Sequence, residues 1–147
     1  TSKNIAELSD KHSLLGISFQ LSEDKPYLSQ LQAQRSIQDI IVMTADKFLN
    51  HPIPSSITLV VSMRYHGCVW ASLNGIPFLA LAIDSKIQHL ASQCGQLSLT
   101  IDQLNQSPMI VSQTVTKIMS DYDIYQSQLA SRVPELINQS KKHQDIL

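Results

Sequence analysis

Apolar and polar positions alternate so that the middle of the chain predicts strands and helices in turn. Apolar runs of strand length occupy residues 57–63 and 77–83, and short helical stretches are expected over residues 68–73 and 86–94. Asn74-Gly75 and Gly95 are typical of helix ends, and Asp84-Ser85 is typical of a helix N-cap. Because strands and helices follow one another at short spacing, the pattern predicts a parallel sheet flanked by helices.

The sequence on either side predicts one more strand and long amphipathic helices. Residues 14–19 have strand length, and residues 27–49 repeat apolar positions at intervals of three and four. After Ser98 the pattern is helical throughout, with Ser107 as an N-cap before Pro108 and a kink at Pro134. We expect the polar ends, residues 1–13 and 138–147, to be loose.

The composition is that of one globular domain with little net charge. Of 147 residues, 43% are hydrophobic and 16% are charged, and the formal net charge is −1. This balance excludes a broad basic surface for nucleic acid or an anionic membrane. The two cysteines make neither a disulfide framework nor a metal cluster, and no apolar run is long enough to cross a bilayer. We therefore expect a single cytoplasmic α/β domain over residues 1–147, without metal or cofactor.

Arg64 and His66 are the strongest candidates for chemistry, because they directly follow an apolar strand. Ligands of open parallel sheets bind outside the carboxyl ends of the strands, and a helix N-terminus there attracts anions. An Arg side chain matches a carboxylate or phosphate, a His side chain transfers protons near neutral pH, and Gly67 permits close approach of a ligand. Lys86 follows the next strand and could add a second cation at the same edge. The combination predicts an anion site with an acid–base group.

Plainer interpretations stand beside these. The Arg64–His66 segment could be a surface turn in which His66 stacks on Tyr65. Asp84 could act only as an N-cap with Lys86 in solvent, and spacing alone favours that interpretation. Cys68 lies two positions from His66, but their side chains should diverge, so we interpret Cys68 as a small core residue.

The same residues resemble the polysaccharide pyruvyl transferase family. The family pattern is an apolar strand, Ser-x-Arg-Leu-His-Ala, a helix of small residues, Gly-hydrophobic-Pro, a second strand and a Lys. This chain has, in the same order, Ser62-Met63-Arg64-Tyr65-His66-Gly67, Gly75-Ile76-Pro77 and Lys86. The resemblance implies a Rossmann-like parallel sheet flanked by helices with a helical C-terminal tail, which is half of a GT-B-like fold.

Pyruvyl transfer from phosphoenolpyruvate to a saccharide hydroxyl is the activity that the resemblance implies. The product is a ketal in cell-surface polysaccharide, and the acceptor is a saccharide or lipid-linked saccharide. Arg64 would hold the phosphate or carboxylate of the donor, and His66 would protonate its enol carbon. Tyr65, Lys86 and Gln20 would complete the donor site. The expected location is the cytoplasm, at the inner face of the membrane, with no cofactor.

The chain departs from the family pattern in several places. Tyr65 replaces the usual Leu, Gly67 the usual Ala, and Gln20 stands where relatives often have Arg. The chain starts with Thr and lacks the N-terminal domain, so we interpret it as a shortened second half, with a homo-oligomer or a missing domain as partner. A non-catalytic binding or assembly module derived from the family is the alternative function. Half of a sugar-nucleotide glycosyltransferase, with Asp102 or Glu135 on a ribose, ranks third.

Overall fold

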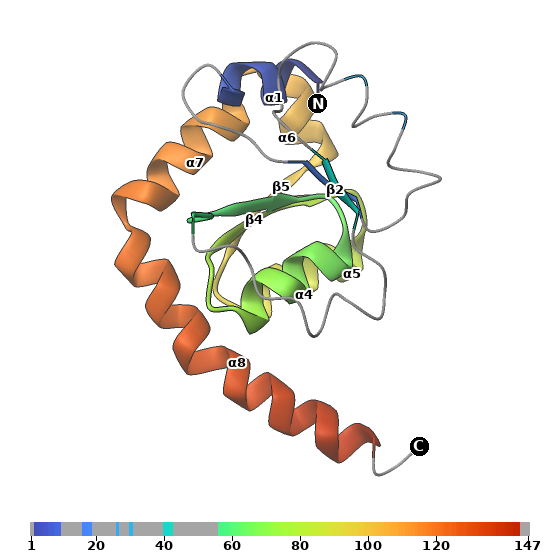
Figure 1. Cartoon of the computed structure of the whole chain (residues 1–147), viewed down its shortest axis with the longest axis vertical. Coiled ribbons are helices and arrows are strands. Elements are labelled where there is room, and N and C mark those ends of the chain that lie inside the picture. Colours follow the sequence, from blue (N-terminus) through green and yellow to red (C-terminus); the bar gives the residue numbers. More distant parts are fainter. Residues whose placement is uncertain are drawn as a thin grey trace. The chain divides into compact units, whose positions relative to one another are not determined.

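The computed structural model describes residues 2–9, 16–18, 26, 30, 40–42 and 56–144 (Figure 1). The chain divides into two compact units. The first comprises Thr1–Pro52 with Ile101–Thr116, and the second comprises Ile53–Thr100 with Lys117–Leu147. The second unit therefore holds all the residues predicted to carry chemistry except Gln20 and Asp102.

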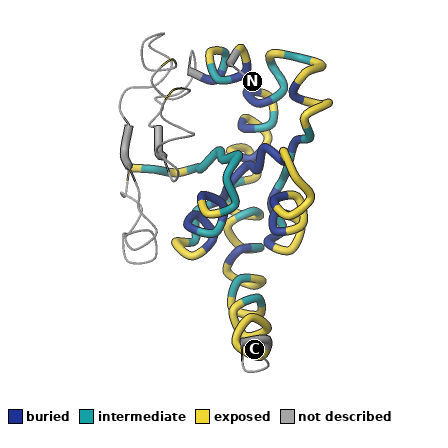
Figure 2. Tube along the Cα trace, turned by 90° about the vertical axis from the view of Figure 1, so that its right-hand side faces the viewer, coloured by how far each residue is buried: buried dark blue, intermediate teal, exposed yellow. Residues whose placement is uncertain are grey.

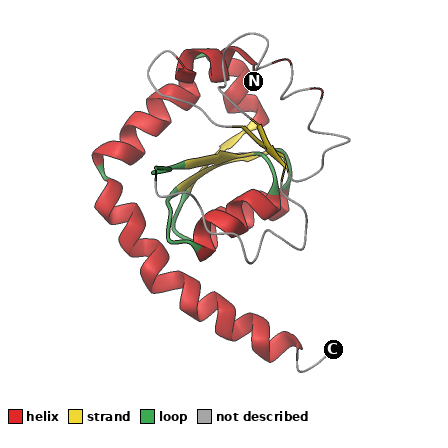
Figure 3. Ribbon diagram, in the orientation of Figure 1, coloured by secondary structure: helices red, strands yellow, loops and turns green. Residues whose placement is uncertain are grey.

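A parallel sheet of three described strands forms the second unit's centre, in the order β3-β4-β5 (Figure 3). The strands are β3 (Val60–Ser62), β4 (Phe78–Ala82) and β5 (Leu97–Thr100). Val60 is in register with Phe78, and Leu79 with Leu97. All five residues of β4 are buried, as suits an apolar strand between two neighbours. The predicted parallel sheet is confirmed, whereas the half-buried residues of β3 show that this strand is less covered than we predicted.

Two helices pack on one face of this sheet (Figure 1). Helix α4 (Tyr65–Leu73) contacts β3 and β4, and α5 (Ser85–Gln93) contacts β4 and β5. Buried residues are dark blue in Figure 2. The buried residues between the helices and the sheet, together with one residue of the last helix, are small or apolar. They are Cys68, Ala71, Phe78, Ala80, Ile87, Leu90, Ala91, Cys94 and Leu129. Cys68 is thus a core residue, as we interpreted it from the sequence.

Local signals end both helices where the sequence predicts and begin α5 there, whereas α4 begins at Tyr65, three residues before the expected start. Asp84 is the N-cap of α5, and its Oδ1 accepts a hydrogen bond from the Ile87 N–H at 2.9 Å. Asn74 is the C-cap of α4, and the following Gly75 has a φ of 68°. Gly95, after α5, has the same φ. Glycine enters this left-handed region without a steric penalty, so both helices stop there.

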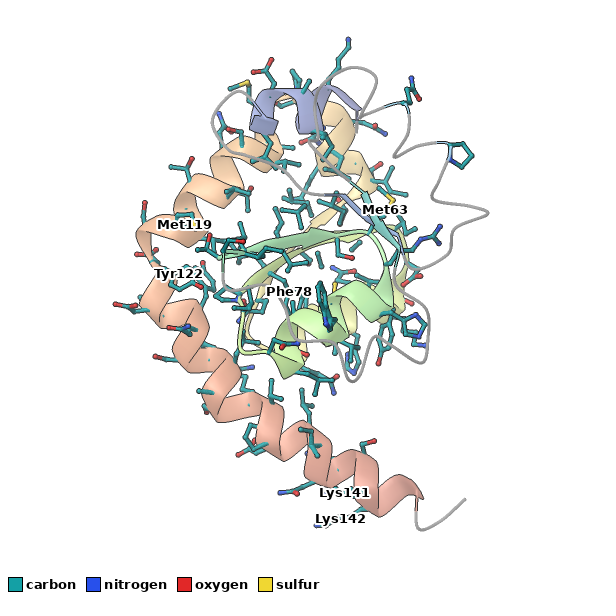
Figure 4. All side chains as sticks on the ribbon, in the orientation of Figure 1. Met63, Phe78, Met119, Tyr122, Lys141 and Lys142 are labelled. Atoms are coloured by element: carbon teal, nitrogen blue, oxygen red, sulfur yellow. The ribbon has the colours of Figure 1, made fainter. Side chains whose placement is uncertain are left out.

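Helix α8 (Tyr122–Gln144) completes the second unit. Leu129 is buried, and Val133 and Leu136 pack against the core. At its start the Tyr122 hydroxyl, labelled in Figure 4, donates to the Thr58 carbonyl at 2.8 Å. The helix continues through Pro134 and includes residues 138–144, where we expected a loose end. Gln and Lys are frequent there, and both have a high helix propensity.

One buried amide joins three elements of the second unit. The Gln96 Oε1 accepts from the Phe78 N–H at 3.3 Å. Its Nε2 donates to the Cys94 carbonyl at 3.1 Å and to the Tyr125 carbonyl at 3.0 Å. Because a buried amide without partners would destabilise the fold, these bonds make Gln96 a specific link between β4, α5 and α8.

Strand β5 corrects the prediction that the chain is helical throughout after Ser98. Leu97 and Leu99 alternate with Ser98 and Thr100, which is a strand pattern only four residues long. The helices that follow are α6 (Ile101–Gln106) and α7 (Ile110–Ser120). The Ser107 hydroxyl accepts from the Met109 N–H at 3.1 Å, but the helix begins at Ile110 and not at Pro108.

The first unit contains a second parallel pair, β1 (Gly16–Ser18) with β2 (Ile40–Val42), and α1 (Ser2–Ser9). Strand β2 corrects the helix predicted over residues 27–49, because Ile-Ile-Val is β-branched and favours a strand. Helix α1 replaces the loose N-terminal segment that we expected, and the Asn4 Nδ2 donates to the Leu104 carbonyl at 3.1 Å. Gln20 and most of residues 27–49 lie outside the described residues.

The two left-handed glycines provide a matched test of how closely α8 approaches the end of α5. A Cβ added at Gly95 would lie 2.8 Å from the Gln128 Cβ, whereas a Cβ at Gly75 would meet no described atom within 4 Å. Gly75→Ala should therefore cost only the strain of the left-handed backbone, about 1–2 kcal/mol. Gly95→Ala should lower the free energy of unfolding by about 1–3 kcal/mol more, because α8 must shift. Urea unfolding measures both losses, and equal losses would contradict the close approach.

Candidate functional site

Arg64 occupies the junction between β3 and α4. It is the N-cap residue of α4, with extended backbone angles of φ −109° and ψ 136°, and its side chain makes no capping hydrogen bond. A guanidinium has donors only, so it cannot accept a bond from the helix N–H groups. The residue is half-buried. The predicted order of strand, Arg and helix is therefore confirmed.

Ser62, the last residue of β3, shapes the backbone at this junction. Its hydroxyl donates to the Arg64 carbonyl at 2.9 Å and accepts from the Arg64 N–H at 3.0 Å. Ser side chains often form such turns with the residue two positions ahead. We did not include Ser62 among the predicted site residues, because the helix was expected to begin only at Cys68 and spacing alone does not reveal these bonds.

Tyr65 joins the ends of two neighbouring strands. The Lys86 Nζ lies 4.2 Å from the centroid of the Tyr65 ring, which is within the range of a cation–π interaction. Tyr65 follows β3 and Lys86 follows β4, so the carboxyl ends of the two strands meet at one edge, as parallel pairing requires. The His66 ring stands edge-on to Tyr65, with 6.0 Å between ring centroids and 83° between planes.

The structure also contains contacts that the non-functional interpretations of His66 and Asp84 predicted. His66 contacts Tyr65, and the Asp84 carboxylate acts as an N-cap. Lys86 is exposed, yet its ammonium group lies over an aromatic ring and not only in solvent. The structure thus brings Tyr65, His66 and Lys86 together beside the Arg64 backbone. This arrangement can offer cationic groups and a titratable imidazole to a small anion.

The two cysteines do not belong to the candidate chemistry. Both are free and buried. Burial raises the pKa of Cys68 to about 12, and a hydrogen bond with Ser62 opposes this only in part. Burial likewise raises the pKa of Cys94 to about 11, with Arg132 acting in the opposite direction. Because the thiolate is the reactive form, neither group suits a nucleophile at neutral pH.

Two further classes of site find no support in the described part of the chain. No group of three or more His, Cys, Asp or Glu side chains is arranged there to hold a metal ion. Among the same residues, no helix is both long and apolar enough to span a membrane. The candidate chemistry of the second unit therefore centres on Arg64, Tyr65, His66 and Lys86.

Comparisons of the chain with protein-family models, curated proteins and solved structures found no match. The resemblance to polysaccharide pyruvyl transferases therefore stays a prediction that rests on the motif residues themselves. So does the half of a GT-B-like fold, beyond the α/β arrangement of the second unit.

The contact between Lys86 and Tyr65 predicts a signature in solution. The ring should shift the NMR signals of the Lys86 Cε protons upfield, because the adjoining Nζ lies 4.2 Å from the centroid of the Tyr65 ring. Tyr65→Phe should keep this shift and Tyr65→Leu should remove it. Lys141, an exposed residue of α8, provides an unshifted reference. Lys86 signals equal to those of Lys141 in the unmodified protein would contradict the contact.

Stability should fall at alkaline pH because of Cys68. The thiol pKa rises from 9.0 to about 12 on folding, so between these values the unfolded chain loses a proton that the folded chain keeps. Fewer bound protons in the unfolded state mean that the free energy of unfolding decreases as pH rises. Urea unfolding from pH 8 to 11 should give a shallower decrease for Cys68→Ala. Identical slopes in the two proteins would contradict burial of the thiol.

Proposed function

We propose that the carboxyl edge of β3 and β4 binds phosphoenolpyruvate and transfers its pyruvyl group to a saccharide hydroxyl. The observation that carries the proposal is the 4.2 Å approach of Lys86 to the Tyr65 ring, which brings a second cation to the segment that contains Arg64 and His66. A small, highly charged anion needs cationic groups held in place before it binds. The family resemblance of this segment supports the choice of donor.

Arg64 and Lys86 share the charge of the donor in this proposal. The guanidinium of Arg64 binds a carboxylate or phosphate through two parallel hydrogen bonds, for which its planar shape is suited. Lys86 supplies a compact ammonium from the neighbouring strand end. The Tyr65 ring keeps that ammonium near the edge when no anion is bound. The Asp84 carboxylate is engaged with the Ile87 N–H of α5, and this bond holds it at the helix end.

His66 acts as the general acid. Its imidazole is exposed, so it can exchange protons with solvent between turnovers. It donates a proton to the terminal enol carbon of the donor, and the adjacent carbon becomes electrophilic. One sugar hydroxyl then attacks that carbon, and its proton returns to the His66 imidazole. A second hydroxyl displaces inorganic phosphate, which carries away the remaining hydroxyl proton, and the ketal is complete.

A non-catalytic binding or assembly module is the second candidate. It is favoured by large apolar side chains of the second unit that remain exposed, which a partner or a second copy could cover. They are Leu73, Ile83, Met119, Ile124 and Ile137. In that case the cationic edge would bind a ligand without turnover, or none at all.

Binding of the donor tests the proposal directly. At a phosphoenolpyruvate concentration ten times the Kd, the protein should gain about 1.4 kcal/mol of stability, which is roughly 3–6 °C in Tm. Arg64→Ala should abolish the shift, and Lys86→Ala should reduce it. Lys141→Ala removes an exposed lysine at the far end of α8 and should leave the shift unchanged (Figure 4).

The variants and the assembly state separate the two candidates. His66→Ala should keep the thermal shift, because it removes the acid and not the anion-binding groups. An absent shift at millimolar phosphoenolpyruvate would count against the proposed enzyme. A stable dimer in light scattering that ignores the donor would favour the assembly module.

A further inference from the structure

We infer that Ser62 is a positioning residue that fixes the backbone conformation of Arg64 where the chain passes from β3 to α4. This inference rests on the proposed function, because the direction of Arg64 matters only if its guanidinium binds the donor. Ser62 itself need not touch the donor, since its hydroxyl is engaged with backbone groups of the chain.

The hydroxyl of Ser62 holds both backbone polar groups of Arg64. Its hydrogen goes to the Arg64 carbonyl at 2.9 Å, and one lone pair accepts the Arg64 N–H at 3.0 Å. A hydroxyl has one hydrogen and two lone pairs, so these two bonds use its only hydrogen and one of its lone pairs.

These bonds control the peptide groups on both sides of the Arg64 Cα. The Arg64 carbonyl also accepts a hydrogen bond from the Cys68 N–H at 3.3 Å, and this bond connects the N-cap residue to the first turn of α4. Ser62 thereby connects the end of β3 to the first turn of α4 through a single residue. With its backbone held at φ −109° and ψ 136°, Arg64 has only side-chain torsions left to order when an anion binds. A smaller loss of conformational freedom gives tighter binding.

Ser72 provides a matched comparison within the same unit. Its hydroxyl donates to the Val69 carbonyl at 2.7 Å, three residues earlier in the same helix. Such a bond satisfies the hydroxyl locally and does not hold a residue of the candidate site. Ser62→Ala and Ser72→Ala each delete one hydroxyl from a residue that is not exposed, so they differ mainly in which backbone groups lose a partner.

Calorimetric titration with phosphoenolpyruvate tests the positioning role. Ser62→Ala should weaken binding about fivefold to tenfold, the effect expected for roughly one net hydrogen bond. Ser62→Thr keeps the hydroxyl and should restore the affinity, and Ser72→Ala should leave it unchanged. Unchanged affinity in Ser62→Ala, or an equal loss of affinity in Ser72→Ala, would overturn the inference.

Amide hydrogen exchange provides a test that does not need the donor. The Arg64 N–H should exchange faster in Ser62→Ala than in the unmodified protein, and at the original rate in Ser62→Thr and Ser72→Ala. If phosphoenolpyruvate fails to bind the unmodified protein, the proposed enzyme is wrong, and exchange at Arg64 still decides whether Ser62 holds this residue. Unchanged exchange in Ser62→Ala would overturn that role. Should Ser62→Ala fail to fold, Ser62→Cys, with its weaker donor, should give an intermediate rate.

Discussion

Burial of β4 is the constraint on which the second unit depends. Phe78–Ala82 are five consecutive buried residues, and each must exclude water while its backbone groups pair with β3 and β5. A strand of this kind is stable only with parallel neighbours on both sides and helices on its face. Parallel pairing in turn places the carboxyl ends of β3 and β4 at the same edge. The position of the candidate site therefore follows from the hydrophobicity of one strand.

Strand pairing determines at which edge of the sheet the candidate residues lie, and side-chain contacts determine their positions more closely. Pairing alone puts Tyr65 and Lys86 on one edge, but the cation–π contact brings the ammonium group over the ring. Similarly, Arg64 follows β3 because of chain order, whereas its backbone direction depends on the Ser62 hydroxyl. The candidate site thus consists of long cationic side chains on a rigid base. Such a base limits the conformational entropy that an anion must overcome when it binds.

The sequence predicts those elements whose signals are local and strong. Asp84 and Gly95 bound α5 because an N-cap acceptor and a left-handed glycine act within a few residues. Strand β5 was missed, because alternation of Leu97 and Leu99 over four residues is too short to outweigh the helical pattern that follows. In the candidate site, chain order was enough to predict that Arg64, His66 and Lys86 follow two strands of the sheet at the same edge. The two hydrogen bonds between the Ser62 hydroxyl and the Arg64 backbone depend on three-dimensional backbone geometry, which residue spacing does not reveal.

The buried amide of Gln96 has a consequence for how the second unit opens. One planar group bonds the first residue of β4, the end of α5 and the second turn of α8. Detachment of α8 would strip this amide of a partner in a dry interior, and loss of strand pairing would do the same. Opening at either place therefore costs hydrogen bonds of the same amide. We expect the sheet and α8 to unfold together as one cooperative unit, which leaves few partly open states for proteases to attack.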